Sequence, residues 1–404
     1  MGIDTGNTAF VLIAAAMVLL MTPGLAFFYG GLVRGKNVLN TMLMSVVAMG
    51  VVAIEWALLG YSMAFAPGSS VLGGLDFVGF SGVGAAPQAG QTIPHLAFAA
   101  FQMMFAIITP ALISGAIVGR MKFKAYVPFI LLWAIVVYNP LCHWVWGGGW
   151  LADLGVMDFA GGIVVHVTAG SSALVLAKML GSRRGFPKEL RPPHNPGMTM
   201  IGASMLWIGW FGFNAGSALA ADGSASMAML VTHISAATAS LTWAFLEWRR
   251  FGKASLVGIV TGMVAGLATI TPASGFVGPI GALFIGLMAG VLCHFGVEWV
   301  KQKIQIDDSL DVFAVHGLGG ALGTLLTAFF AATSLGGMGL AEGATMGSQF
   351  GVQLLGILAV VVWSVLVSYI IIKVVGAMVG LRVDEEDEVE GLDLVAHGER
   401  GYDL

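Results

Sequence analysis

Apolar segments of 20 or more residues recur along this chain, and they restrict its fold more than any other feature of the sequence. A helix needs about 20 apolar residues to cross the hydrocarbon core of a bilayer. The alternating ten-residue segments that are typical of a membrane β-barrel are not evident. Only 10% of the residues are charged, whereas a soluble domain has about 25%. The sequence therefore predicts an all-α, polytopic membrane protein.

Eleven spans are expected. They lie at 9–32, 41–65, 94–119, 125–145, 159–180, 197–217, 226–248, 254–273, 279–300, 310–332 and 348–378. Spans 1–5 and 6–10 form two sets of five, and an odd number per set gives the two sets opposite orientations, as in inverted-repeat transporters. The eleventh span is long and unpaired. We expect a transmembrane domain over residues 1–380 and a short acidic cytoplasmic tail over 381–404, without a cleaved signal peptide.

The basic residues predict the orientation of the chain. All 18 Lys and Arg residues fall on one side of the predicted spans, while the opposite loops carry acids such as Asp76, Asp153, Asp222 and Glu342. Because loops rich in Lys and Arg stay in the cytoplasm, we expect the N-terminus outside and the C-terminus inside. The predicted location is the plasma (inner) membrane.

Two histidines are the most informative polar residues in the spans. His166 follows Asp158 at the start of span 5, and His316 follows Asp311 at the start of span 10. At 1.5 Å per residue each histidine lies about 10 Å inside its own boundary, so the two approach each other near the middle of a core of about 30 Å. Neutral imidazoles there would both donate and accept hydrogen bonds and could handle a proton. The alternatives are two structural histidines, or a metal site, which is weaker because zinc takes three or four ligands.

Aromatic residues gather near the predicted outer side, where they could hold a cation against their ring faces. The aromatic residues are Phe101 and Phe105 of span 3, Trp146 of span 4, and Trp210 and Phe213 of span 6. Ser217 lies just beyond them in span 6. The alternative is an ordinary interfacial aromatic belt. Asp158 is predicted to cap its helix through the amide of Gly161 or Gly162, and its charge would also favour an incoming cation.

Glu55 lies far from either end of span 2, and an acid at that depth is unusual. We interpret it as a protonated or hydrogen-bonded structural acid at a helix or subunit interface, with a role in proton movement as the alternative. No Ser–His or His-Glu-x-x-His arrangement suggests an intramembrane enzyme. We expect neither a metal nor a cofactor.

Strings of residues along the whole chain resemble the ammonium transporter family (Amt/MEP/Rh), in its prokaryotic Amt form. They lie at 23–31, 34–37, 143–149, 158–166, 209–217, 271–273, 311–317 and 379–383. The resemblance implies a homotrimer with one pore per subunit, and regulation by a PII signalling protein at the cytoplasmic face. It implies an external ammonium site of Phe101, Phe105, Trp146 and Ser217 supported by Asp158, a gate of Phe105 and Phe213, and a pore pair of His166 and His316.

The chemistry of the pore residues agrees with this resemblance. Ammonium can donate hydrogen bonds and lose a proton, whereas potassium cannot. Neutral ammonia can then cross an apolar pore that rejects dehydrated ions. An ammonium sensor on the same scaffold is the alternative function.

Overall fold

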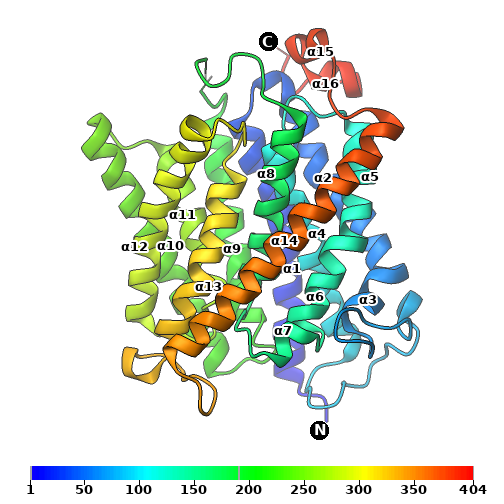
Figure 1. Ribbon diagram of the computed structural model, residues 1–404, viewed down its shortest axis with the longest axis vertical. Helices are drawn as coiled ribbons and strands as arrows, with labels where there is room; N and C mark the ends of the chain where they lie inside the picture. The colour runs from blue at the N-terminus through cyan, green and yellow to red at the C-terminus, as the bar shows by residue number, and fades with distance from the viewer. Residues whose placement is uncertain (1, 190–191, 404) are drawn as a thin grey trace.

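The computed structural model describes residues 2–189 and 192–403, where the chain forms a bundle of helices without β-strands (Figure 1). Arg191, one of the basic residues used to predict orientation, lies outside this part of the chain. The α-helices are α1 Thr5–Leu32, α2 Val38–Glu55, α3 Tyr61–Phe65, α4 His95–Ile113, α5 Phe123–Trp133, α6 Asn139–Trp146, α7 Trp150–Asp153, α8 Thr168–Leu180, α9 Pro196–Gly216, α10 Gly223–Phe251, α11 Leu256–Ile270, α12 Pro279–Glu298, α13 Gly319–Phe330, α14 Met346–Val379, α15 Glu385–Glu390 and α16 Leu392–His397. The π-helical turns are η2 Trp56–Gly60, η5 Ala134–Tyr138, η6 Gly162–Val167, η7 Trp299–Lys303 and η8 Phe313–Leu318. Short 3₁₀ turns are η1 Gly35–Asn37, η3 Val78–Phe80, η4 Ser114–Ala116 and η9 Thr333–Leu335.

Nine helical segments in the described part of the chain are long and apolar enough to cross a membrane. They correspond to nine of the predicted spans. The other two predicted spans, 197–217 and 254–273, correspond to α9 and to the shorter apolar helix α11. The all-α polytopic fold is therefore confirmed, while the number eleven and the inverted repeat stay predictions.

Small residues allow close contact between the first helices of the two predicted halves. α1 and α9 pack together along their lengths. A Cβ atom on Gly202 of α9 would fall 2.1 Å from the backbone nitrogen of Phe28 in α1, so no other residue fits there without moving the helix. This close approach is the usual way in which helices associate in lipid. α14 then crosses the outside of the bundle obliquely (Figure 1).

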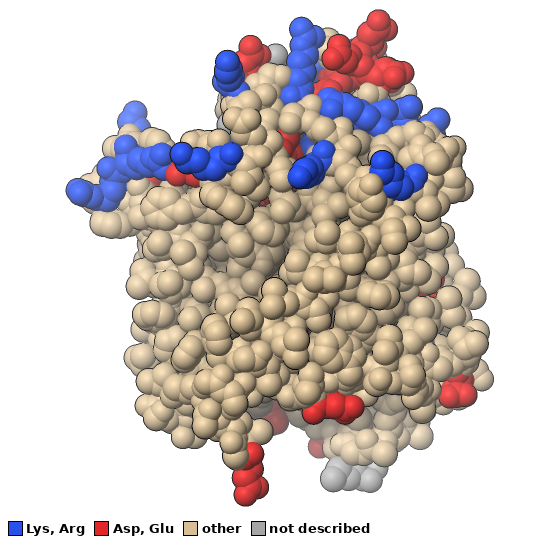
Figure 2. Space-filling view, viewed as in Figure 1, with Lys and Arg blue, Asp and Glu red and all other residues tan. Residues whose placement is uncertain are grey.

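Charge divides the two ends of the bundle. Figure 2 shows Lys and Arg side chains gathered at one end, which we call the basic end, and Asp and Glu side chains on the visible face of the opposite end, which we call the acidic end. The C-terminus lies at the basic end and the N-terminus at the acidic end (Figure 1). This separation agrees with the loop pattern that predicted the orientation.

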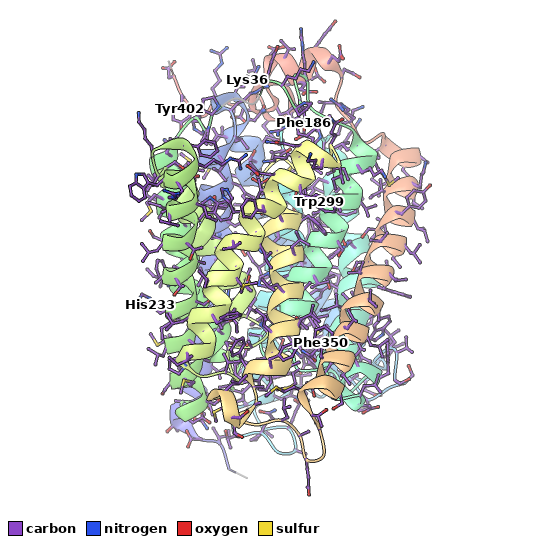
Figure 3. The ribbon with its side chains drawn as sticks, turned by 60° about the vertical axis from the view of Figure 1, so that its left-hand side comes forward. Lys36, Phe186, His233, Trp299, Phe350 and Tyr402 are labelled. Atoms are coloured by element: carbon purple, nitrogen blue, oxygen red, sulfur yellow. The ribbon has the colours of Figure 1, made fainter. Side chains whose placement is uncertain are left out.

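The acidic tail lies against the basic end of the bundle. The Asp393 carboxylate accepts a hydrogen bond of 2.8 Å from the backbone N–H of Asn40, near the start of α2. The Tyr402 hydroxyl is 2.8 Å from the Nε2 atom of His194, and Lys36 donates to the carbonyl of Val389. Figure 3 shows Lys36, Tyr402 and Phe186 together at this end. The boundary between the two predicted domains near residue 380 stays a prediction.

Candidate functional site

The two predicted histidines meet inside the bundle. The Nδ1 atoms of His166 and His316 are 3.2 Å apart, and the rings stack with centroids 5.1 Å apart and an angle of 26°. Their exposed fractions are 1% and 3%. The predicted contact is therefore present, and the two imidazoles share one hydrogen bond in apolar surroundings.

Asp158 holds the helical turn that carries His166. Its Oδ1 accepts from the N–H groups of Gly161 and Gly162, at 2.9 and 2.6 Å, and its Oδ2 accepts from those of Ile163 and Val164, at 2.9 and 3.0 Å. The predicted cap is thus present and involves four amides. These are the N–H groups at the start of a helix that have no partner within it. The turn begins with Gly161 at a φ of 115°, where a Cβ atom would also come within 2.6 Å of the Val165 side chain.

The corresponding acid for His316 is Asp308, which corrects the predicted pairing with Asp311. Asp308 accepts hydrogen bonds from the N–H groups of Val312 and Phe313, at 3.1 and 2.7 Å, at the start of η8. Asp311 has a φ of 64° and forms an ion pair of 2.6 Å with Lys301. Asp158 precedes His166 by the same number of residues as Asp308 precedes His316, so this spacing was the signal that sequence analysis missed.

Two phenylalanine rings close the path on one side of the histidines. The centroids of Phe105 and Phe213 are 4.3 Å apart at an angle of 37°. Phe213 lies over the His166 ring at 6.1 Å. Trp210, which was predicted among the outer aromatic residues, instead stacks on His166 at 5.4 Å, and its indole N–H donates to Thr271 at 2.8 Å.

A cavity of about 310 Å³ lies on the other side of these rings, and none of its lining residues is charged. Phe105, Trp146 and Ser217 from the predicted set line it. The Ser217 hydroxyl donates to the carbonyl of Phe213 at 2.8 Å, which leaves its oxygen free to accept a hydrogen bond from a ligand. Gln102, which sequence analysis did not single out, also lines the cavity.

The other two predicted recruitment residues, Phe101 and Asp158, are not among the residues that line this cavity and instead contact two that are. Phe101 packs edge-on against Phe105 at 4.9 Å. The Asp158 side chain accepts hydrogen bonds from the four amides, and its backbone carbonyl accepts a hydrogen bond of 2.8 Å from the indole N–H of Trp146. Three of the predicted residues therefore line the cavity, and the other two hold lining residues in position.

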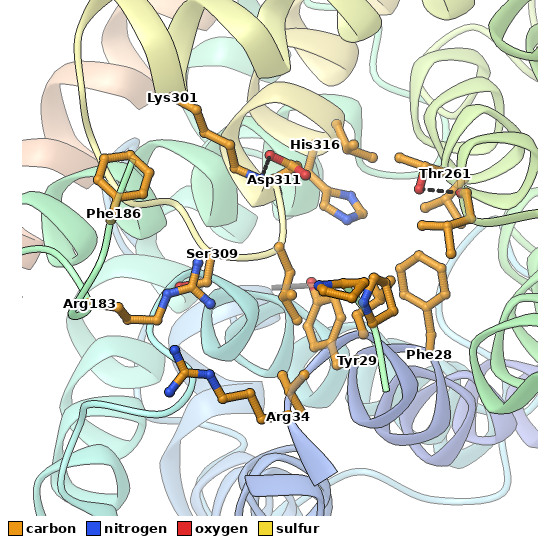
Figure 4. Close-up of a pocket in the computed structure, with 18 of the residues that line it drawn as sticks. Phe28, Tyr29, Arg34, Arg183, Phe186, Thr261, Lys301, Ser309, Asp311 and His316 are labelled. Carbon is orange, nitrogen blue, oxygen red and sulfur yellow. Dashed lines mark hydrogen bonds and ion pairs between the residues drawn. The ribbon is translucent and has the colours of Figure 1, made fainter. Parts of the chain in front are cut away.

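Two further cavities continue the path past the histidines. A small one of about 10 Å³ is lined by apolar side chains together with Phe213, His166 and His316, and can hold about one water molecule. A cavity of about 230 Å³ opens at the basic end and reaches His316 (Figure 4). Phe28, Val264 and His316 line both of these cavities, and the Phe105–Phe213 pair separates the small one from the cavity of about 310 Å³; we call this series of three cavities the route.

A buried ion network frames the basic end of this route. The Arg120 guanidinium is 0% exposed and donates to the carbonyls of Ala116, Gly181 and Asp307 and to the hydroxyl of Ser309. Burial lowers the pKa of Arg120 to about 10, against the opposing effect of the Asp307 charge. Burial alone would raise the pKa of Asp307, but hydrogen bonds from Arg183 and the charges of Arg183 and Arg120 leave it below its usual value. This network ties the loop that carries Asp308 to the loop after α8.

Known proteins identify the family. The model of the Ammonium Transporter Family matches residues 9–402. The chain belongs to the ammonium transporter family. It is 47% identical to an ammonium transporter of Bacillus subtilis over 400 residues, with 98% of each chain covered. It is 43% identical to ammonium transporter Amt1 of Archaeoglobus fulgidus, with 98% of this chain and 99% of the relative covered.

Solved structures agree with the family assignment. A structure titled Sensor Amt Protein has a TM-score of 0.91 at 30% identity, covering 97% of this chain and 98% of that one. The structure of Saccharomyces cerevisiae Mep2 has a TM-score of 0.85 at 37% identity, covering 95% and 91%. The chain is therefore a multi-pass membrane protein of an ammonium transporter fold, and membership of this family implies a non-enzymatic role.

Proposed function

We propose that this ammonium transporter conducts ammonia through the route described above, after taking a proton from ammonium. The observation that carries the proposal is the His166–His316 contact of 3.2 Å, which lies in the middle of the route, next to the Phe105–Phe213 pair. An aromatic constriction next to a cavity of about one water disfavours a hydrated ion but admits a small neutral molecule.

Recruitment of ammonium is assigned to the cavity of about 310 Å³ that Phe105, Trp146 and Ser217 line, which we call the recruitment cavity. The face of Trp146 attracts a cation by about 0.5–2 kcal/mol. Ser217 offers a hydroxyl oxygen that accepts a hydrogen bond, and Phe105 forms the floor. Phe101 fixes the Phe105 ring, and Asp158 fixes Trp146 and contributes negative charge behind the residues that line the cavity. Ammonium gains hydrogen bonds here that potassium cannot make.

Conduction is assigned to the histidine pair. Ammonia that has passed Phe105 and Phe213 meets imidazole nitrogens that both donate and accept hydrogen bonds. The Nε2 atom of His166 has no hydrogen-bond partner in the described part of the chain, so it is available to the permeant. The proton lost by ammonium has a route across the shared Nδ1–Nδ1 bond.

Assembly and orientation complete the proposal. The acidic end faces the outside of the plasma (inner) membrane and the basic end faces the cytoplasm, because basic loops stay inside. The subunits form a homotrimer with one pore each. A PII signalling protein docks at the basic end, where Glu388 of the tail accepts a hydrogen bond from the backbone N–H of Arg184, one of the residues that line the exit cavity.

The experiment compares ammonium and potassium currents in proteoliposomes. Replacing His166 and His316 together by Ala is expected to abolish ammonium flux or its selectivity over potassium. The matched control is His233→Ala, which removes an exposed histidine that stacks on Trp207 at 5.1 Å, on the side of the bundle (Figure 3). Unchanged flux and selectivity in the double variant would falsify the role of the pair.

A sensor is the second candidate function, because the Sensor Amt Protein structure matches nearly the full length of this chain. Binding and flux separate the two functions. A protein that binds ammonium in liposomes and moves none is a sensor, whereas a transporter shows a saturable ammonium-dependent current.

A further inference from the structure

Glu55 is a buried acid that the proposed transport route does not use. It ends α2, which is 18 residues long, so it lies about 26 Å from the start of that helix at 1.5 Å per residue. Its exposed fraction is 4%. Oε1 accepts a hydrogen bond of 2.8 Å from the side-chain amide of Asn139, and Oε2 has no partner among the described residues. An acid at this depth is by default a candidate functional group.

No positive charge in the described part of the chain balances the Glu55 carboxyl. In the described ranges, no Lys, Arg or His side chain forms an ion pair with it. The titratable side chains that the packed elements place around this region are ordinarily uncharged. They are Tyr61 of α3, Tyr138 and Cys142 of η5 and α6, and His95 of α4, which is hydrogen-bonded to Tyr61. A bare carboxylate inside a membrane is costly, and one amide hydrogen bond does not offset that cost.

The local structure leaves oxygen atoms without partners and leaves little space. The π-helical turns η2 and η5 lie against each other, and the Glu55–Asn139 hydrogen bond joins their ends. Such turns often mark functional sites. The Tyr138 hydroxyl and the Asn139 side-chain oxygen are also buried without partners. A Cβ atom on Gly60 would fall 2.7 Å from Oε2, so the carboxyl is tightly enclosed. A proton fits this enclosure better than a larger cation.

The same helix links Glu55 to the recruitment cavity. α6 begins with Asn139, which holds Glu55, and ends with Trp146, which lines the cavity. A change in the charge of Glu55 therefore acts on the start of α6 through the Asn139 bond, and the helix carries a displacement of that end to Trp146.

We propose that Glu55 and Asn139 form a proton-binding site inside the bundle, separate from the histidine pair, and that loss of this proton weakens ammonium recruitment through α6. With the proton bound, the carboxyl is neutral and its hydrogen bond with Asn139 joins the end of α2 to the start of α6. Without it, the buried anion favours an arrangement in which water reaches the carboxylate, which displaces the start of α6 and moves Trp146. The second half of this inference rests on the proposed recruitment site, and the first half does not.

Infrared spectroscopy of the protein in liposomes tests the proton-binding site itself. The carbonyl stretch of a protonated carboxylic acid is expected in the wild type, disappearing as pH rises, and absent from Glu55→Gln. Glu342→Gln, which changes an exposed acid, is the matched control and keeps the band. The variant that replaces both pore histidines by Ala also keeps it. The site is refuted if the wild type has no such band, if Glu55→Gln retains it, or if it does not respond to pH while the protein stays folded.

Transport currents test the link to recruitment. Above the pH at which the band disappears, the ammonium concentration for half-maximal current is expected to rise at least about fivefold in the wild type. Glu55→Gln mimics the neutral acid, so its half-maximal concentration stays constant over the same range. If it follows the wild-type pH profile instead, the link to recruitment is wrong. Asn139→Leu is a second variant that removes the hydrogen bond and is expected to shift the pH at which the band disappears; an unshifted band contradicts the site.

Loss of all current in the double histidine variant, with the Glu55 band intact, leaves both proposals standing. Retained current in that variant overturns the proposed pore mechanism while the infrared result still decides the Glu55 site. The two proposals therefore fail on different measurements.

Discussion

Replacing Asp158 by Asn isolates the energetic value of its charge, because the side chain keeps its size. In the wild type each carboxylate oxygen accepts two N–H groups of η6. The Asn amide leaves one accepting oxygen and turns an NH₂ group toward the other two amides. Hydrogen bonds to a charged group contribute about 1.5–3 kcal/mol each, so losing two costs about 3–6 kcal/mol.

Asp308→Asn gives a smaller loss of stability with which the loss in Asp158→Asn can be compared. Asp308 receives one N–H on each oxygen, from Val312 and Phe313, so the same change removes one bond and costs about 1.5–3 kcal/mol. The assay is thermal denaturation of each variant in the same lipid nanodisc, which does not depend on transport. Asp76→Asn, an exposed acid at the opposite end from the tail, is the neutral control.

The expected order of melting temperature is wild type and Asp76→Asn first, then Asp308→Asn, then Asp158→Asn. If Asp158→Asn melts at or above Asp308→Asn, the cap is not the main role of the acid. Its charge would then serve recruitment alone, and the argument from four amides would be wrong.

Three further predictions concern the cavity, the helix contact and the ion network. Trp146→Leu is expected to raise the half-saturating ammonium concentration roughly 2- to 30-fold with less change in maximal current, because it removes about 0.5–2 kcal/mol of attraction; transport kinetics check this, and an unchanged half-saturation contradicts it. Gly202→Ala is expected to lower the yield of folded protein, whereas Gly50→Ala, which has no atom within 4 Å of the new Cβ, is neutral, as size-exclusion profiles will show. Arg183→Gln removes the partner that keeps the pKa of Asp307 low. The stability that this pairing provides is present above the unfolded Asp pKa of about 3.9 and is lost as pH falls through the lower folded value. The variant should therefore be less stable at neutral pH and converge on the wild type in acid; a constant difference would contradict this assignment.

Features set by local pattern were predictable from the sequence. The helices begin and end within a few residues of most predicted spans, because apolar runs and membrane thickness fix them. The proximity of His166 and His316 was predictable because it depends only on the helical rise per residue and on the orientation of the two spans. The Asp158 cap followed from an acid placed just before a helix with glycines.

Features set by contacts between distant segments were not predictable. The sequence predicted that Asp311 corresponds to Asp158, because each lies at the start of a span that carries a histidine. The structure shows why this failed: Lys301, from the end of the preceding span, pairs with Asp311 and leaves the cap to Asp308. Likewise, nothing in the acidic composition of the tail indicated that Asp393 would bind the start of α2.

The contact between the two Nδ1 atoms has a consequence for how often the histidine pair can act. A neutral imidazole carries one ring hydrogen, and a bond between two Nδ1 atoms needs one hydrogen there. One ring is therefore the Nδ1–H tautomer and the other the Nε2–H tautomer, so the pair is asymmetric although its two halves look alike. In the proposed route, a proton enters at the Nε2 atom of the first ring, the bridging hydrogen moves to the second ring, and the second ring releases its own Nε2 hydrogen, so both rings end in the opposite tautomer. Reversing these steps through the bond would carry a proton back. The two rings must therefore separate and regain their first tautomers before a second proton can pass in the same direction.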